Sequence, residues 1–100
     1  MAHKDPVTPE VRRAVLKRDN GCVGLTVGMP RQCGTQFGEG TKGPLEIDHV
    51  VSGGFGKRGP SVQENLVSLC GIHHRVKTES SKLWRAKILE YLERYYGKND

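Results

Sequence analysis

The segment that decides the fold begins with Leu45-Glu46-Ile47-Asp48-His49-Val50-Val51. It alternates apolar and polar residues as far as His49, which is typical of a half-buried strand. A glycine-rich basic loop, SGGFGKRGP over residues 52–60, comes next, and Asn65-Leu66-Val67-Ser68-Leu69 predicts a second short strand. Residues 71–78 predict a short helix. We therefore expect strand, loop, strand and helix in that order, in a core that spans about residues 45–79.

A helix is expected on each side of this core. Toward the N-terminus, Thr8 can cap a helix, Pro9 suits its first position and Asp19-Asn20-Gly21 ends it, which predicts a helix over about residues 9–18. Toward the C-terminus, a helix over about residues 81–96 carries an apolar stripe of Trp84, Ile88, Tyr91, Leu92 and Tyr95. Residues 22–44 lack sustained periodicity and are expected to form a loop. The 100 residues are thus expected to form one α+β domain.

The composition leaves little material for a core. Only 35% of the residues are hydrophobic and 13 are glycine, and a domain of this size buries only about two thirds of the surface that its unfolded chain exposes. The three cysteines are an odd number, which argues against a complete disulfide framework. The chain shows neither a signal peptide nor an apolar run of membrane-spanning length. We therefore expect a cytoplasmic protein without a membrane partner, in which cysteines bind a metal.

The charge balance favours a polyanionic partner without identifying one. Sixteen lysines and arginines stand against eleven acidic residues, for a net charge of +5. Such a surface suits nucleic acid, but an ordinary solvated surface explains the same charge equally well. The partner has to be identified from motifs.

Four residues have the pattern of a structural zinc site. Cys70 and His73 are separated by two residues, the spacing at which two ligands reach one ion from a tight turn, and Cys22 and Cys33 are the other cysteines. A Cys₃His set closes the tetrahedron without water, which is typical of structural rather than catalytic zinc. Ten residues separate Cys22 from Cys33, so the first pair is not a standard knuckle. Buried thiols that serve packing alone are the alternative.

A second set, Asp48, His49, Asn65 and His74, suits phosphodiester hydrolysis. That reaction needs a base to deprotonate water and a divalent cation to neutralise the phosphate. Histidine suits the base near neutral pH, and a carboxylate with an imidazole can hold a cation. Taken singly, each residue is better explained as an ordinary exposed side chain. Together, on strand, loop, strand and helix, they indicate a site.

Three blocks of this sequence resemble the HNH endonuclease signature. They are EIDHV over residues 46–50, ENLVSLC over residues 64–70 and HHRVK over residues 73–77. The resemblance implies a ββα-metal (His-Me finger) core, in which a β-hairpin packs on a helix and the metal lies between them. It implies a metal-dependent DNA endonuclease that nicks DNA or cuts both strands and leaves 5′-phosphate and 3′-hydroxyl ends. Family members of this size include phage-encoded nucleases, so other phage DNA-processing proteins are candidate partners beside DNA.

The resemblance also implies a role for each residue of the second set. His49 would be the general base, and Asp48 and His74 would hold the catalytic cation, Mg²⁺ or Mn²⁺, with Zn²⁺ or Ni²⁺ as further candidates. Asn65 would be structural, hydrogen-bonding across the loop so that His49 points at the scissile phosphate. A regular strand sends Asp48 and His49 to opposite faces, so both can serve one site only if the strand ends or bends there. Consecutive helical residues point about 100° apart, so His73 and His74 cannot easily share one ion. The spacing from Cys70 assigns His73 to the zinc, and the resemblance assigns His74 to the catalytic cation.

Several basic residues near these blocks are candidate phosphate contacts. Lys57 and Arg58 lie in the glycine-rich loop, and Arg75 and Lys77 follow His74. Arg12, Arg13, Lys17 and Arg18 could form a further basic patch. For any one of these basic residues, a solvated surface role is the better explanation. Two other function classes fit the same residues: a zinc-stabilised nucleic-acid-binding module without cleavage activity, and an interaction adaptor that uses the zinc fold as a scaffold.

Overall fold

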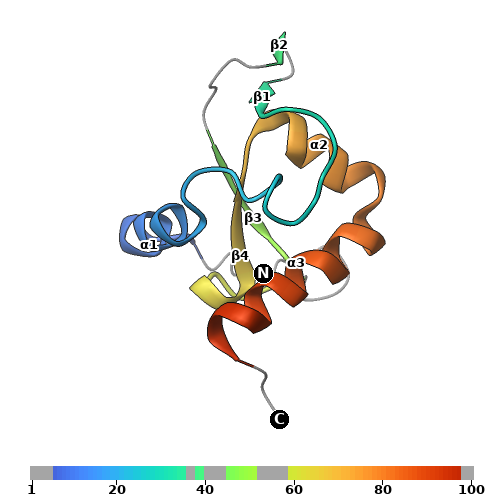
Figure 1. Ribbon diagram of the computed structural model, residues 1–100. Coiled ribbons are helices and arrows are strands. Elements are labelled where there is room, and N and C mark those ends of the chain that lie inside the picture. Colours follow the sequence, from blue (N-terminus) through green and yellow to red (C-terminus); the bar gives the residue numbers. More distant parts are fainter. Residues whose placement is uncertain (1–5, 36–37, 40–44, 52–58, 98–100) are drawn as a thin grey trace, which may run out of the picture.

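A two-stranded antiparallel hairpin lies at the centre of the molecule (Figure 1). The computed structural model describes residues 6–35, 38–39, 45–51 and 59–97. Strand β3 (Glu46–His49) pairs with β4 (Leu66–Leu69), with Glu46 opposite Leu69 and His49 opposite Leu66. Both strands fall within the segments that the sequence predicts. Asn65 belongs instead to a 3₁₀ helix, η1 (Gln63–Asn65).

Three helices surround the hairpin, as the sequence predicts. Helix α1 (Pro9–Asp19) begins at Thr8, whose Oγ1 accepts a hydrogen bond from the Val11 N–H at 3.2 Å, and it runs one residue further than expected. Helix α2 (Gly71–Glu79) follows β4, and α3 (Ser81–Tyr96) follows α2 directly. Gly97 ends α3 with a φ of 85°, a left-handed conformation that glycine adopts without steric cost. These elements confirm the α+β class.

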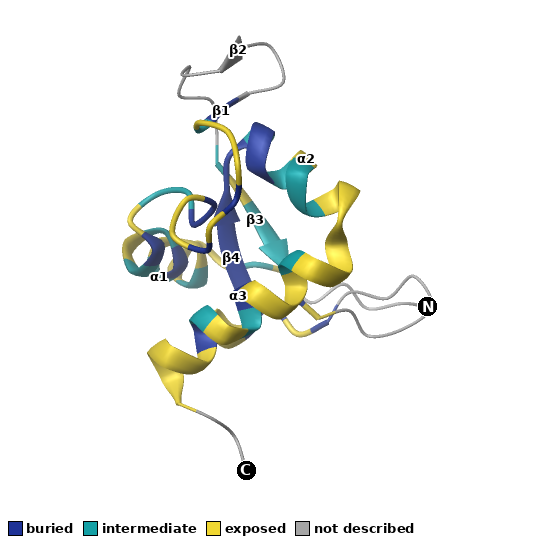
Figure 2. Ribbon diagram, turned by 45° about the vertical axis from the view of Figure 1, so that its right-hand side comes forward, coloured by how far each residue is buried: buried dark blue, intermediate teal, exposed yellow. Residues whose placement is uncertain are grey.

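Helices cover both faces of β4, and this makes it the most buried element. In Figure 1, α1 lies on one side of the hairpin and α2 and α3 lie on the other. All four residues of β4 are buried, whereas β3 is only partly buried, which Figure 2 shows as dark blue against teal. Three of its four residues are apolar, as expected of a strand that is buried on both faces. The core consists of Val23, Val27, Met29, Val50, Val67, Leu69, Ile88 and Leu92.

The segment expected to be a featureless loop contributes more than the sequence indicates. Val23, Val27 and Met29 pack into the core, and two short strands, β1 (Gly34–Thr35) and β2 (Gly38–Glu39), pair antiparallel after Cys33. Residues 22–33 remain irregular, so hydrophobic periodicity could not reveal their burial. No helix within the described part of the chain is long and apolar enough to cross a bilayer.

The apolar stripe of α3 ends earlier than expected. Ile88 and Leu92 are buried and Trp84 and Tyr91 pack against the core, but Tyr95 is 59% exposed. Its neighbour Tyr96 is also exposed, but its ring centroid lies 5.7 Å from the guanidinium carbon of Arg18. The expectation that Tyr95 lies on the buried stripe is therefore wrong.

A buried ion pair in α1 links this helix to α3 and to strand β4. The Asp19 carboxylate is fully buried and accepts hydrogen bonds from Arg18 Nε at 2.7 Å, the Ser68 N–H at 2.8 Å and the Tyr91 hydroxyl at 2.6 Å. Arg18 also donates to the Leu66 carbonyl at 2.5 Å. Burial and the bond to Asp19 together raise the pKa of Tyr91 to about 12. Arg18, predicted as part of an exposed basic patch, is instead a structural residue whose side chain is 2% exposed.

Candidate metal centre and polar cluster

The four predicted zinc ligands lie together. Cys22 follows α1, Cys33 precedes β1, Cys70 caps α2, and His73 lies in the first turn of that helix. Their three sulfur atoms and one imidazole nitrogen all lie within 4.8 Å of one another. This set is close enough to hold a metal ion.

The distances within the set match the edges of a tetrahedral site. His73 Nδ1 lies 3.3 Å from Cys22 Sγ, 3.3 Å from Cys70 Sγ and 3.7 Å from Cys33 Sγ. A tetrahedral zinc ion with bonds of about 2.3 Å to sulfur and about 2.0 Å to nitrogen gives sulfur-to-nitrogen edges of about 3.5 Å. The three sulfur-to-nitrogen distances therefore fit this geometry to within about 0.2 Å.

The surroundings of His73 leave Nδ1 as the ligand atom. Its Nε2 lies 2.9 Å from the Arg31 carbonyl and 3.2 Å from the Pro30 carbonyl. A carbonyl only accepts, so Nε2 carries the proton and Nδ1 presents a lone pair, the arrangement usual for metal-bound histidines. Gly24 lies against the same ring, because a Cβ at this position would be 2.3 Å from His73 Nδ1.

Backbone N–H groups point at two of the sulfur atoms. Cys22 Sγ accepts from Cys70 N at 3.1 Å and Gly24 N at 3.3 Å, and Cys70 Sγ accepts from Gly34 N and His73 N, both at 3.4 Å. Burial raises the pKa of Cys22 to about 12 despite its N–H donors. Burial also acts to raise the pKa of Cys70, but the N–H groups of Gly34 and His73 outweigh it, and the pKa falls. A metal that binds all three sulfurs as thiolates would therefore release protons.

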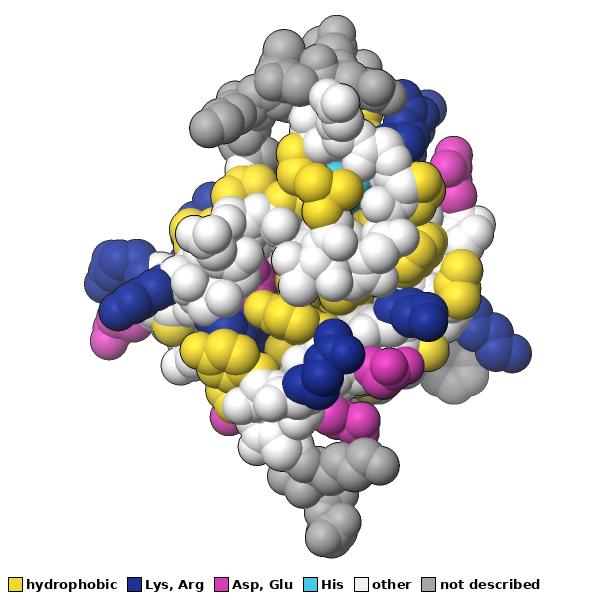
Figure 3. Space-filling view, in the orientation of Figure 1, with side chains coloured by type: hydrophobic (Ala, Val, Ile, Leu, Met, Phe, Trp, Pro, Cys, Tyr) yellow, Lys and Arg dark blue, Asp and Glu magenta, His cyan; other side chains and the backbone are white. Residues whose placement is uncertain are grey.

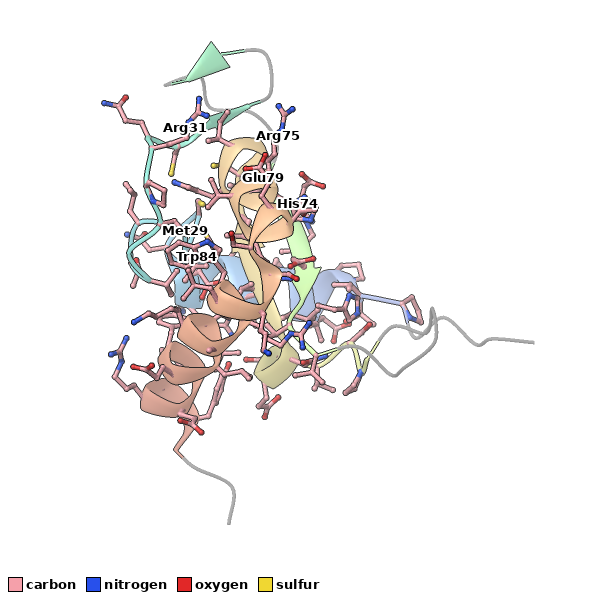
Figure 4. The ribbon with its side chains drawn as sticks, turned by 90° about the vertical axis from the view of Figure 1, so that its right-hand side faces the viewer. Met29, Arg31, His74, Arg75, Glu79 and Trp84 are labelled. Carbon is pink, nitrogen blue, oxygen red and sulfur yellow. The ribbon has the colours of Figure 1, made fainter. Side chains whose placement is uncertain are left out.

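A second polar cluster forms where α2 crosses β3. His74 Nε2 lies 3.5 Å from Asp48 Oδ1, and its Nδ1 lies 3.8 Å from Glu46 Oε2, so the imidazole stands between two carboxylates. Lys77 Nζ lies 2.5 Å from Asp48 Oδ2. In Figure 4, His74 projects from the side of α2 that faces β3, whereas Arg75 points away from that strand. The structure thus brings Asp48 and His74 together, and adds Glu46 and Lys77 to them.

The environment of Asp48 suits a cation. Its side chain is 18% exposed, and Oδ2 is inaccessible to solvent and accepts no hydrogen bond of good geometry from the described residues. A buried carboxylate oxygen is costly unless a cation or a donor compensates it. The ammonium of Lys77 supplies such a charge, and a divalent cation would supply more.

His49 has a different neighbour. Strand β3 ends at His49 and the chain bends at Val50 and Val51, so the regular alternation of the strand stops at this position. His49 Nε2 lies 2.9 Å from Ser61 Oγ. Ser61 is buried beside the hairpin and no motif in the sequence points to it.

Asn65 joins the two ends of the segment between the strands. Its buried carboxamide accepts from the Val51 N–H at 2.9 Å and donates to the carbonyls of Val51 and Pro60, both at 3.0 Å. Next to it, a Cβ at Gly59 would lie 1.9 Å from the Val51 carbonyl oxygen, so a side chain there requires the backbone to move. These contacts hold residue 51, two positions after His49, against residues 59–60.

Two of the four candidate phosphate contacts, Arg75 and Lys77, lie within the described residues. Lys57 and Arg58 lie outside the described residues. Arg75 is exposed, whereas the side chain of Lys77 is 13% exposed and is paired with Asp48. On the face drawn in Figure 3, lysine and arginine side chains are spread over the surface and do not gather in one patch.

Glu46 and the Asp48–Lys77 pair were not predicted as parts of one cluster. The sequence does carry a weak signal for them, because Glu46 lies two residues before Asp48 on the strand and Lys77 lies three residues after His74 on the helix.

Comparisons with protein-family models, with curated proteins and with solved structures found no match for this chain.

Proposed function

We propose that this chain is a metal-dependent DNA endonuclease of the HNH type, with a ββα-metal core and a structural zinc ion. The observation that carries the proposal is the pairing of Asp48 with His74, which lie 3.5 Å apart across β3 and α2. A carboxylate and a neutral imidazole are suitable ligands for a divalent cation that keeps positions for phosphate and water.

Each residue of the cluster has a distinct task in this proposal. Asp48 and His74 hold Mg²⁺ or Mn²⁺, which when bound neutralises the phosphate and the leaving oxygen. His49 accepts a proton from the attacking water, and Ser61 keeps its imidazole in place. Asn65 is a positioning residue that fixes the chain directly after His49. Glu46, near His74 Nδ1, favours a proton on that nitrogen and leaves Nε2 for the cation.

The Cys₃His set holds zinc as a structural element in this proposal. Four protein ligands leave no position for water, so the ion takes no part in the chemistry. Its contribution is to anchor the first turn of α2, because Cys70 and His73 both lie there. His74 is the next residue, so the zinc also fixes the catalytic cation ligand.

A plasmid-nicking assay tests the proposal. Supercoiled plasmid should be nicked or linearised in Mg²⁺ or Mn²⁺ and left intact in EDTA. His49→Ala should lower the rate by about 10²–10⁴-fold, the usual contribution of a general base, while its DNA affinity and melting temperature stay near those of the wild type. Nicking by His49→Ala at the wild-type rate would remove His49 from the mechanism.

One observation favours a second candidate, a zinc-stabilised DNA-binding module without cleavage activity. The Lys77 ammonium already compensates Asp48, so the charge of this carboxylate is neutralised without a metal. This candidate predicts DNA binding that weakens steeply with salt, together with intact plasmid in both cations. The same assay separates the two candidates.

A further inference from the structure

The ion pair of Lys77 with Asp48 is short and shielded from solvent. Lys77 Nζ lies 2.5 Å from Asp48 Oδ2 and 3.5 Å from the His49 carbonyl, and the two side chains are 13% and 18% exposed. Lys77 therefore contacts both the proposed cation ligand and the backbone of the proposed base. An exposed surface lysine that binds phosphate alone would need neither contact.

We propose that Lys77 is the counter-ion of the cation site and couples cation binding to phosphate binding. This inference rests on the proposed function. In the free protein the ammonium compensates Asp48. When a divalent cation takes the carboxylate, the ammonium is released and pairs with the phosphate instead.

The chemistry of the two groups supports this exchange. A divalent cation on Asp48 Oδ1, the oxygen nearest His74, and an ammonium on Oδ2 would lie within a few ångströms of each other on one carboxylate, so the two charges repel. Lysine suits the exchange because its charge is a point charge on a flexible four-carbon stem, so it can change partner without a fixed geometry. Phosphate gives the displaced ammonium a new anion. By linkage, phosphate must then raise the affinity for the cation, and the cation must raise the affinity for phosphate.

Binding of Mn²⁺ to the zinc-loaded full chain tests the first half of the proposal. Free Mn²⁺ is measured by electron paramagnetic resonance in the absence of DNA. Lys77→Met should bind Mn²⁺ about tenfold more tightly than the wild type, because the competing charge is gone. Lys77→Arg keeps the charge and should bind as weakly as the wild type. Lys82→Met removes the same charge from an exposed position of α3 and should change nothing. Zinc content and melting temperature establish that each variant is folded.

A second measurement tests the coupling. In a His49→Ala background, which suppresses cleavage, a short DNA duplex should tighten Mn²⁺ binding. In His49→Ala/Lys77→Met it should tighten Mn²⁺ binding much less. Equal Mn²⁺ affinity of Lys77→Met and wild type, no Mn²⁺ binding by Lys77→Met, or full tightening in the double variant would each overturn the inference. Failure of the cation site itself is recognised separately, since Asp48→Asn would then bind Mn²⁺ as tightly as the wild type.

Discussion

One added methyl group at Gly24 should weaken the metal centre. Gly24 lies two residues after Cys22 and directly against the ring of His73. The Cβ of an alanine there would lie 2.3 Å from Nδ1 and 2.4 Å from Cγ of His73, whereas ordinary van der Waals contacts begin at 3.4 Å. The ring or the chain at residue 24 must therefore move by about 1 Å.

A displacement of this size is too large for a metal ligand. Metal–ligand distances are held to within about 0.2 Å, so the shifted Nδ1 can no longer complete the set. Changes that only disturb the support of a ligand lower metal affinity by about 10–100-fold, and loss of the ligand itself should cost at least about 100-fold in zinc affinity. The free energy of binding a structural zinc also contributes to the free energy of folding, so the melting temperature should fall as well.

The assay is a zinc competition titration against a chromophoric chelator, combined with thermal unfolding followed by circular dichroism. Gly28→Ala is the matched control. Gly28 has a φ of 88° and no atom within 4 Å of its added Cβ, so alanine there should cost about 1–2 kcal/mol of stability through backbone strain without touching the ligands. Zinc affinity of Gly24→Ala within threefold of the wild type would refute the assignment of His73 Nδ1 as a ligand.

Three further predictions concern neighbouring residues. His73→Ala should lose its zinc and melt at lower temperature, whereas His74→Ala should keep one zinc per chain and its fold but cleave DNA poorly. Metal analysis measures the zinc content and plasmid nicking measures the cleavage, and equal zinc loss in both variants would contradict two separate sites. Asn65→Ala removes three hydrogen bonds of a buried carboxamide and should cost about 2–4 kcal/mol in urea unfolding, with a change below about 1 kcal/mol counting against the clamp. Tyr91→Phe removes the hydrogen bond to Asp19 and should cost about 1 kcal/mol near neutral pH. Folding raises the pKa of Tyr91 from 10 to about 12, so this contribution to stability is complete below pH 10 and is lost as the pH rises to 12. The melting temperature of the wild type should therefore fall more steeply between pH 10 and pH 12 than the melting temperature of Tyr91→Phe.

Local patterns in the sequence predicted the elements well, because helix caps, alternation and short ligand spacings all act within a few residues. Thr8 begins α1, Gly97 ends α3, and the alternation of residues 45–49 predicts β3. The two-residue separation of Cys70 and His73 likewise places both ligands on one turn. Each of these features depends on backbone geometry that a short segment determines alone.

The path of the irregular segment could not be predicted in the same way. Cys22 and Cys33 reach one ion only because residues 23–32 fold back, with Val23, Val27 and Met29 in the core. Irregular segments have no hydrophobic period that marks their buried side. The zinc site was therefore predicted from the number of cysteine and histidine ligands, and the path of the chain between Cys22 and Cys33 was not predicted.

Tertiary contacts also decide the fate of charged residues. In the sequence, Arg18 is one of several basic residues on a helix. In the structure, its guanidinium donates hydrogen bonds to the Asp19 carboxylate and the Leu66 carbonyl. Lys77 reads as a phosphate contact, yet it pairs with Asp48, almost thirty residues earlier in the chain. A sequence shows the sign of a charge, whereas its partner depends on which distant segments the fold brings together.

Both clusters draw their members from each side of residues 52–58. Cys22, Cys33 and Asp48 lie before this segment, and Cys70, His73 and His74 lie after it. The two strands of the hairpin are divided in the same way. If the chain were divided between Val51 and Gly59, each fragment would hold half of a sheet, two of four zinc ligands and one of two proposed cation ligands. Zinc bound at the Cys₃His set would therefore link the two pieces of such a divided chain, because each piece supplies two of the four ligands.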